Sequence, residues 1–209
     1  MDYFDISPPV AAFTPVFPGD QPFERSITMD MEKGDNIGLS WIKTTLHIGA
    51  HTDAPSHYHK NGAPIEQRDL SYYMGDCQVI DVRHVGARRI VPKDFEQISI
   101  TAKRVLFKTL SFRHDQPFQM EFTSLSPELI DSLSAQGVRL VGLDTPSVDP
   151  ADSKDLPSHA ALYRNNCAVL EGIDLDRVPA GLYKLVALPL RLVGADASPV
   201  RAVLLPRSF

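Results

Sequence analysis

This chain of 209 residues has few cysteines, no excess of basic charge and no long apolar run. Its two cysteines, Cys77 and Cys167, lie far apart, and we expect buried thiols rather than a disulfide. The formal net charge of −5 provides no basic surface for nucleic acid. No apolar run approaches the ~20 residues of a membrane span. The acidic residues 1–5 lack the basic and then apolar order of a signal peptide. We therefore expect a cytoplasmic protein without nucleic-acid or membrane partners.

Proline is abundant, and the 17 prolines fall mostly between the predicted elements. This distribution predicts several stiff connections around a compact sheet. The chain is 43% hydrophobic and 22% charged, a balance typical of globular proteins. Because no repeat, low-complexity tract or linker interrupts it, we predict one domain over residues 1–209.

Strand patterns outnumber helix patterns along the chain. Alternating apolar residues and β-branched runs predict strands at residues 5–7, 26–33, 36–47, 77–83, 104–108, 138–144, 167–170, 182–193 and 200–205. Helices are predicted at residues 92–96, 126–136 and 159–165. Ser126 and Ser158 are the predicted N-caps of the last two. The mixed order of elements indicates a mixed α/β (α+β) class.

Four of the seven histidines lie between His47 and His59. Four potential ligands in this stretch lie 0, 4, 6 and 10 positions from His47: His47 itself, His51, Asp53 and His57. Imidazole nitrogens and carboxylate oxygens are the usual ligands of a hydrolytic zinc ion. A histidine-rich loop can also bind metal weakly without any function, but the interleaved Gly, Asp and Pro favour an active site.

The spacing of these residues constrains the local backbone. On a straight strand, His47 and His51 would lie roughly 13 Å apart, too far to share a metal ion. Gly49 and Pro55 argue against a helix, which would bring the two together. We therefore predict a strand that ends near His47 and folds back at Gly49. Pro55 should then hold Ala54 in an extended conformation.

Other candidate residues lie outside this stretch. Glu171 follows a predicted buried strand, where an unpaired carboxylate would be costly. His159 follows a long loop at the end of the strand at 138–144, where sites are often built. Taken alone, His159 is better explained as a helix-surface histidine and Glu171 as a surface carboxylate. Phe17, between two turn-forming prolines, suits either a stacking surface or a plug over the core. The remaining histidines are predicted to be solvated, structural or in a surface loop: His59, His84 and His114.

Three separated blocks together resemble the putative cyclase family, and within it the bacterial kynurenine formamidases (arylformamidases), over nearly the whole chain. The signature H-x-G-x-H-x-D-x-P-x-H is met from His47 to His57. The pattern D-I-S…P-V-x-P-G-D is met at residues 5–7 and 15–20. Residues 142–150, followed by 156–159 and 169–172, are similar to the formamidase subgroup.

The resemblance implies a swivelling β/β/α-type domain, a homodimer and two zinc ions (Zn2+) per subunit. Carried over by position, it implies two ligand sets bridged by the carboxylates: His47, His51, Asp53 and Glu171 for one ion, and Asp53, His159 and Glu171 for the other. It makes His57 the proton donor and acceptor rather than a ligand. Phe17 would stack on the substrate ring, in a position where the subgroup often has tryptophan.

The implied reaction is hydrolysis of N-formyl-L-kynurenine to L-kynurenine and formate. One alternative is a related hydrolase that opens a cyclic amide or lactone such as isatin, and another is a non-catalytic metal-binding protein. The same ligands also suit manganese, cobalt or iron. The sequence does not identify the residues that bind the amino-acid end of the substrate, and Tyr163 and Arg164 are guesses.

Overall fold

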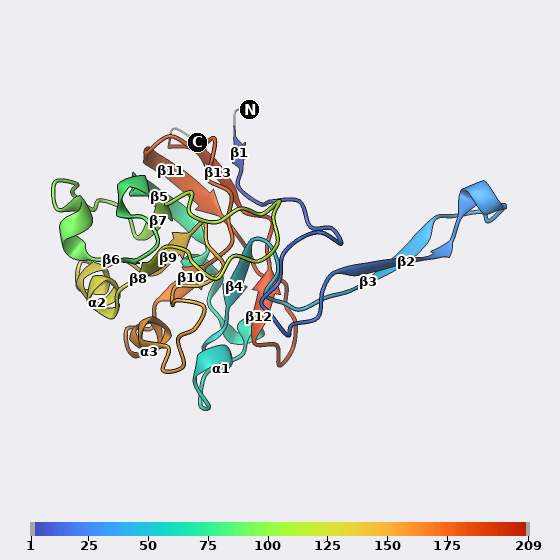
Figure 1. Cartoon of the computed structure of the whole chain (residues 1–209), viewed down its shortest axis with the longest axis horizontal. Helices are drawn as coiled ribbons and strands as arrows, with labels where there is room; N and C mark the ends of the chain where they lie inside the picture. Colours follow the sequence, from blue (N-terminus) through green and yellow to red (C-terminus); the bar gives the residue numbers. More distant parts are fainter. Residues whose placement is uncertain (1–2, 208–209) are drawn as a thin grey trace.

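A mixed seven-stranded sheet forms the centre of the computed structural model, which describes residues 3–207 (Figure 1). Its strand order is β1-β13-β11-β5-β7-β9-β10. In chain order these strands are β1 (Phe4–Asp5), β5 (Met74–Asp81), β7 (Arg104–Lys108), β9 (Leu140–Leu143), β10 (Ala168–Leu170), β11 (Gly181–Val186) and β13 (Val203–Pro206). Strands β5, β7, β9 and β10 are parallel, whereas β1, β13 and β11 pair antiparallel.

Three strand pairs and several short helices surround this sheet within residues 3–207. The pairs are β2 (Glu24–Met29) with β3 (Leu39–Lys43), β4 (His51–Asp53) with β12 (Ala197–Pro199), and β6 (Arg89–Ile90) with β8 (Ser124–Leu125). The α-helices are α1 (Pro55–Tyr58), α2 (Pro127–Ala135) and α3 (Pro157–Arg164). The 3-10 helices are η1 (Met31–Lys33), η2 (Ile65–Gln67), η3 (Leu70–Tyr72), η4 (Arg83–Val85) and η5 (Pro92–Phe95). These elements confirm the predicted mixed α/β fold with few, short helices.

Both faces of the sheet are covered, which explains the continuous apolar runs of its central strands. In β7, Val105 and Phe107 belong to the core on the side of α2 and α3, whereas Leu106 belongs to the core on the other face. Helix α2 begins as predicted, because the Ser126 hydroxyl accepts a hydrogen bond from Leu129 N at 3.1 Å. Cys77 and Cys167 are buried free thiols, as expected.

The strand predicted over residues 36–47 is wrong in its extent. It ends at Lys43, and β2 and β3 form a hairpin that projects from the body (Figure 1). All five residues of β3 are exposed, so the alternating pattern here does not mark a buried face. The predicted strand at 26–33 also ends early, at Met29, and a 3-10 turn follows. We call residues 24–43 the hairpin arm.

Two further boundaries differ from prediction. The strand predicted over 182–193 ends at Val186, and the loop after it leads to β12, which the sequence did not reveal. Ser158 does not cap α3 but lies inside it, buried, with its backbone N–H 3.2 Å from both carboxylate oxygens of Asp149. A carboxylate from the loop that leads into α3 therefore does the capping. Among residues 3–207, no helix is long and apolar enough to cross a bilayer.

Candidate metal centre

A backbone bridge brings the His47–His57 stretch against the end of β10. His51 N donates to Glu171 O at 3.0 Å, and Glu171 N donates to His51 O at 2.9 Å. Glycine is required on both sides of this bridge. Gly49 has φ +55° and Gly172 has φ +62°, and a Cβ on Gly172 would lie 2.2 Å from Gly49 O. The predicted turn at Gly49 is thus confirmed, and its purpose is to place His51 beside Glu171.

Strand β4 presents two site residues on one face. His51 and Asp53 are two residues apart and therefore point the same way, whereas Thr52 points oppositely and donates to Val169 O at 2.6 Å. His51 Nδ1 lies 3.0 Å from Gly49 O. Because a carbonyl only accepts, the proton sits on Nδ1 and Nε2 is left with a free lone pair.

A second carboxylate fixes His159 on α3. His159 Nδ1 lies 2.8 Å from Asp149 Oδ2, and Asp149 Oδ1 pairs with Arg89 at 2.8 Å. Asp149 itself is fully buried and also accepts the backbone N–H groups at the start of α3. This network leaves His159 Nε2 as the free nitrogen, which is how ligand histidines are usually oriented.

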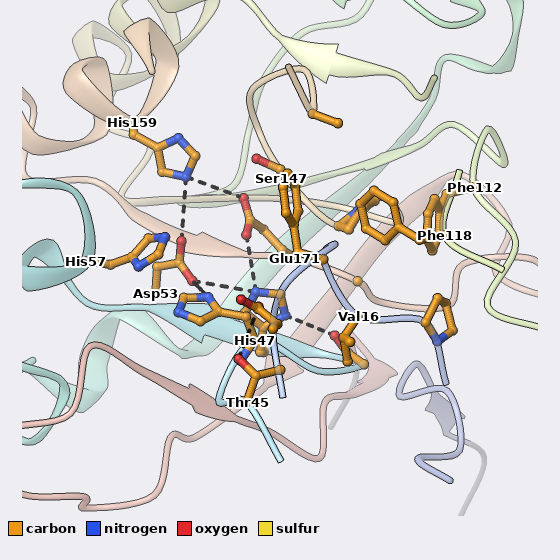
Figure 2. A pocket seen from close by; sticks show the side chains of 18 of the residues that line it. Val16, Thr45, His47, Asp53, His57, Phe112, Phe118, Ser147, His159 and Glu171 are labelled. Carbon is orange, nitrogen blue, oxygen red and sulfur yellow. Dashed lines mark hydrogen bonds and ion pairs between the residues drawn. The ribbon is translucent and has the colours of Figure 1, made fainter. Parts of the chain in front are cut away.

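Five side chains from three segments converge, and Figure 2 labels four of them, His47, Asp53, His159 and Glu171. Asp53 Oδ1 lies 2.9 Å from His47 Nδ1 and 3.5 Å from His51 Nε2, and Asp53 Oδ2 lies 3.6 Å from His159 Nε2. Glu171 Oε2 lies 3.3 Å from His51 Nε2, and Oε1 lies 4.0 Å from His159 Nε2. Atoms bound to one zinc ion at about 2.1 Å are separated by such distances. The structure therefore brings together every residue that the sequence analysis assigned to the metals.

The donor set fits divalent cations. His51 Nε2 and both carboxylate oxygens of Asp53 are buried without a hydrogen-bond partner, which is costly unless an ion completes them. Two groups able to hold a cation share Asp53: one adds His47 and His51, the other His159 and Glu171. A carboxylate between two such groups is suited to bridging.

Neighbouring charges shift the pKa values of three residues in this cluster. Burial opposes protonation of His47, but the carboxylates of Asp53 and Asp196 outweigh it and raise its pKa to about 9. Burial likewise opposes protonation of His159, and Asp149 and Asp53 raise its pKa to about 10. Burial disfavours the charged form of Asp53, yet the surrounding histidines hold its pKa well below the usual value.

His57 lies beside the five proposed ligands and forms a further group able to hold a cation with His47 and Asp196. Pro55 starts helix α1 and Ala54 is extended, as predicted. The His57 ring centroid is 4.2 Å from that of His47 and 6.1 Å from that of His159. The side chain is about a third exposed and lines the cavity described next. A role as proton donor is compatible with this position and stays a prediction.

The cluster opens into a cavity of about 440 Å³. Three phenylalanines line it, Phe17, Phe112 and Phe118, and the ring centroids of Phe17 and Phe118 are 5.0 Å apart. Figure 2 shows Phe112 and Phe118 on the opposite side of the cavity from His57 and His159. Of the two readings of Phe17, the position favours the stacking surface. Asp20 also lines the cavity and accepts a hydrogen bond from Thr45 Oγ1 at 3.2 Å.

Some predictions for other residues are wrong. Tyr163 does not line the cavity but stacks on His59, with ring centroids 3.6 Å apart. Arg164 pairs with Asp131 on the surface, so neither residue is available for the substrate here. His114 lies in a loop between the exposed residues Arg113 and Asp115, as predicted, but its side chain is half-buried, lines the cavity and lies 3.3 Å from Ile173 O through Nε2.

Sequence reasoning missed two carboxylates that contact the site histidines, Asp149 and Asp196. Asp149 lies in a block noted for its resemblance, yet nothing nearby in the sequence indicates that it bonds to His159. Asp196 Oδ2 lies 3.0 Å from His47 Nε2, although 149 residues separate the two. Only the packing of β12 against β4 reveals this contact.

Comparison with known proteins places the chain in a family. The model of the family described as "Putative cyclase" matches residues 4–150. A potential metal-dependent hydrolase with cyclase activity is 32% identical, with a TM-score of 0.83 over 97% of this chain and 96% of that one. A predicted metal-dependent hydrolase from Bacillus stearothermophilus is 31% identical, with a TM-score of 0.82 over 97% of both chains.

More distant structures share the fold. Isatin hydrolase A from Labrenzia aggregata is 22% identical, with a TM-score of 0.81 over 97% of this chain and 93% of that one. At this identity the likeness concerns the fold alone. The matched family model covers well over half of the sequence and includes the whole His47–His57 stretch. The chain therefore belongs to the putative cyclase family.

Proposed function

We propose that this chain is a metal-dependent hydrolase that uses two zinc ions per subunit to hydrolyse N-formyl-L-kynurenine to L-kynurenine and formate. One observation carries the proposal: a largely buried set of five side chains able to hold metal ions opens into a cavity with phenylalanines on one side and His57 on the other. The relatives at 31% and 32% identity, described as metal-dependent hydrolases, support the coarser part of this proposal.

Hydrolysis of a formamide joins a water oxygen to the formyl carbon and breaks the C–N bond. Divalent ions held by the cluster would acidify that water and polarise the formyl oxygen. The departing anilide nitrogen then needs a proton, and His57 is the cavity-lining histidine that lies outside the two overlapping ligand groups and beside them. Such general acid assistance typically contributes about 10²–10⁴ in rate.

The cavity wall supports an aromatic substrate that carries an ammonium group. Phe17, Phe112 and Phe118 offer faces and edges on which an aryl ring can pack. Among the described residues no lysine or arginine lines the cavity. Asp20 lines it and has no histidine partner, so it is suited to the α-ammonium group of the substrate.

The competing substrate class is a cyclic amide such as isatin, because isatin hydrolases share this fold with TM-scores of 0.79 to 0.81. Isatin has no ammonium group for Asp20 to contact. Steady-state rates with zinc-loaded protein on both compounds, followed by absorbance, separate the two proposals. We expect kcat/KM to favour N-formyl-L-kynurenine by at least about 10²-fold. Preference for isatin would favour the competitor, and tight zinc binding without turnover of either would indicate a non-catalytic metal-binding protein.

We also propose that the protein is a homodimer and that the hairpin arm lies at its interface. The arm exposes six large apolar side chains, each at least 47% accessible: Ile27, Met31, Ile37, Leu39, Trp41 and Ile42. An apolar surface of this kind on a projecting hairpin is typical of a binding surface. Sedimentation analysis of the wild-type protein tests the proposal, and a monomer at micromolar concentration would contradict it.

A further inference from the structure

Asp196 occupies a fixed position in the loop between β11 and β12. Its carbonyl accepts a hydrogen bond from Ala54 N at 2.8 Å, and the carbonyl of Ala195 accepts one from Ile65 N at 2.9 Å. Immediately after it, β12 pairs antiparallel with β4, with Ala197 opposite Asp53. The backbone of Asp196 is therefore tied to the strand that carries two of the metal-ligating residues.

One oxygen of this carboxylate serves two histidines. Asp196 Oδ2 lies 3.0 Å from His47 Nε2 and 3.4 Å from His57 Nδ1. The two imidazole rings are consequently held together, with centroids 4.2 Å apart and planes inclined at 41°. The contact to His47 is a hydrogen bond, whereas the contact to His57 has the distance of an ion pair without the geometry of a hydrogen bond. A hydrogen bond from His57 therefore requires the two groups to align and shorten when the site is filled.

The chemical consequence is a defined tautomer for each ring. An ionised carboxylate only accepts, so a hydrogen bond to Asp196 requires a proton on His47 Nε2 and on His57 Nδ1. His47 then presents Nδ1 to the ligand cluster, in agreement with its 2.9 Å distance from Asp53. His57 is left with Nε2 free, which is the nitrogen available for proton transfer. A carboxylate that orients a histidine in this way supports acid–base catalysis on many folds.

We propose that Asp196 is a positioning residue that acts through His57, holding its Nδ1–H tautomer so that Nε2 can deliver a proton to the leaving nitrogen. The inference rests on the proposed function for its catalytic part, whereas the tautomer can be observed without any substrate. In this step the water oxygen bonds to the formyl carbon and one water proton passes to His57 Nε2. The same proton then moves to the anilide nitrogen as the C–N bond breaks, which releases the amine and formate.

The first experiment measures the tautomer directly. In the zinc-loaded wild-type protein at pH 8, the 15N shifts of the His57 side chain should report Nδ1–H, and in Asp196→Asn that preference should be lost. Metal analysis of both proteins accompanies the spectra. An unchanged His57 tautomer in the variant would overturn the proposal.

The second experiment compares two leaving groups. The anilide N-formyl-L-kynurenine needs a proton on departure, whereas 4-nitrophenyl formate releases a stable phenolate that does not. For Asp196→Asn we expect kcat on the anilide to fall by about 10²–10³ with little change in KM, and kcat on the ester to change less than about threefold. In the double variant with His57→Ala, removal of Asp196 should cost nothing further.

A matched control comes from the same loop. Glu66 accepts a hydrogen bond from Gly194 N at 3.1 Å through its side chain and does not line the cavity. Glu66→Gln weakens an anchor of the loop and leaves both histidines with their carboxylate, so it should change neither substrate's kcat. The same selective loss in this variant would show that loop placement is responsible and would contradict the proposal.

Two other outcomes would also overturn it. Equal losses on anilide and ester, with loss of zinc, would mean that Asp196 only supports the ligand His47. The three side chains of His47, His57 and Asp196 could themselves hold a cation. Three equivalents of zinc in the wild type and two in Asp196→Asn, with inhibition by the third, would show that they do. If the wild type cleaves no anilide yet His57 keeps an Asp196-dependent tautomer, the proposed function fails and the positioning role stands.

Discussion

The hairpin arm and the metal centre lie next to each other in the sequence, yet they differ in almost every physical respect. The arm ends at Lys43, and the first of the proposed metal ligands is His47. Every residue of β3 is exposed, whereas His51, Asp53 and Glu171 are each at most 3% accessible. The arm is a local hairpin between near neighbours, and the metal centre depends on contacts between residues more than 100 positions apart, such as His51 with Glu171.

This difference shows that alternating apolar residues predict a strand but do not predict whether its apolar face is buried. Ile37, Leu39 and Trp41 alternate as a half-buried strand would, but their side chains are 47–48% exposed in the structure. The histidine stretch has no clear period, because a glycine turn, a three-residue strand and a short helix follow one another there. Its order comes from the partners it contacts elsewhere in the chain.

The largest expected effect separates the two regions completely. Asp53→Ala removes the carboxylate shared by both ligand groups and should empty the site. Turnover should fall by more than about 10³-fold, because the activation of water by the metal and the proton transfer that follows it are both lost. Metal analysis and circular dichroism check the result, and the oligomeric state should not change. A variant that still binds two equivalents of zinc would refute the bridging role.

The pH dependence of metal affinity comes next. His47 and His159 must lose a proton to ligate, and in the metal-free protein their pKa values are raised to about 9 and about 10. Below pH 9 each added ion therefore displaces a proton, and apparent affinity should rise about tenfold per pH unit, or about 100-fold from pH 6 to 8. Chelator competition at three pH values measures this. A metal affinity that is constant between pH 6 and 8 would show that metal binding displaces a proton from neither histidine.

Trp41→Asp tests the arm and should leave the metal centre intact. Loss of a half-exposed aromatic side chain from a dimer interface should weaken association by about 30-fold, the size expected for a hot-spot residue. Ser40→Asp adds the same charge to the same strand without removing apolar surface and serves as control. Sedimentation velocity gives the dissociation constants, and zinc content should stay the same in both variants. Equal dissociation constants for wild type and Trp41→Asp would exclude the arm from the interface.

The smallest expected effect concerns the residue where the two regions meet. Asp20 lines the cavity, and Thr45, on the far side of the arm in sequence, donates to it. Asp20→Asn keeps the hydrogen-bonding shape and removes the charge, so KM for N-formyl-L-kynurenine should rise about tenfold. KM for formanilide, which lacks an ammonium group, should stay constant. Equal changes for both compounds would mean that Asp20 acts on the fold of the cavity and not on the ammonium group.

The sequence predicted the parts of the molecule that depend on local chemistry. Ser126 and Pro127 predicted the start of helix α2, and Gly49 predicted the turn. Both predictions held because helix caps and left-handed glycines determine the backbone conformation of only a few neighbouring residues. The five proposed ligands, His47, His51, Asp53, His159 and Glu171, followed from motif resemblance, and their side chains converge as expected. The roles of Asp149 and Asp196 could not be predicted, since each contacts its histidine only through tertiary packing.

The most direct test of the central claim is the anomalous X-ray scattering of crystals of the protein loaded with zinc, measured on both sides of the zinc absorption edge. We predict two peaks, one among His47, His51 and Asp53 and one among Asp53, His159 and Glu171, with the Asp53 carboxylate between them. Absence of anomalous density between these side chains, in protein that hydrolyses N-formyl-L-kynurenine, would contradict the account.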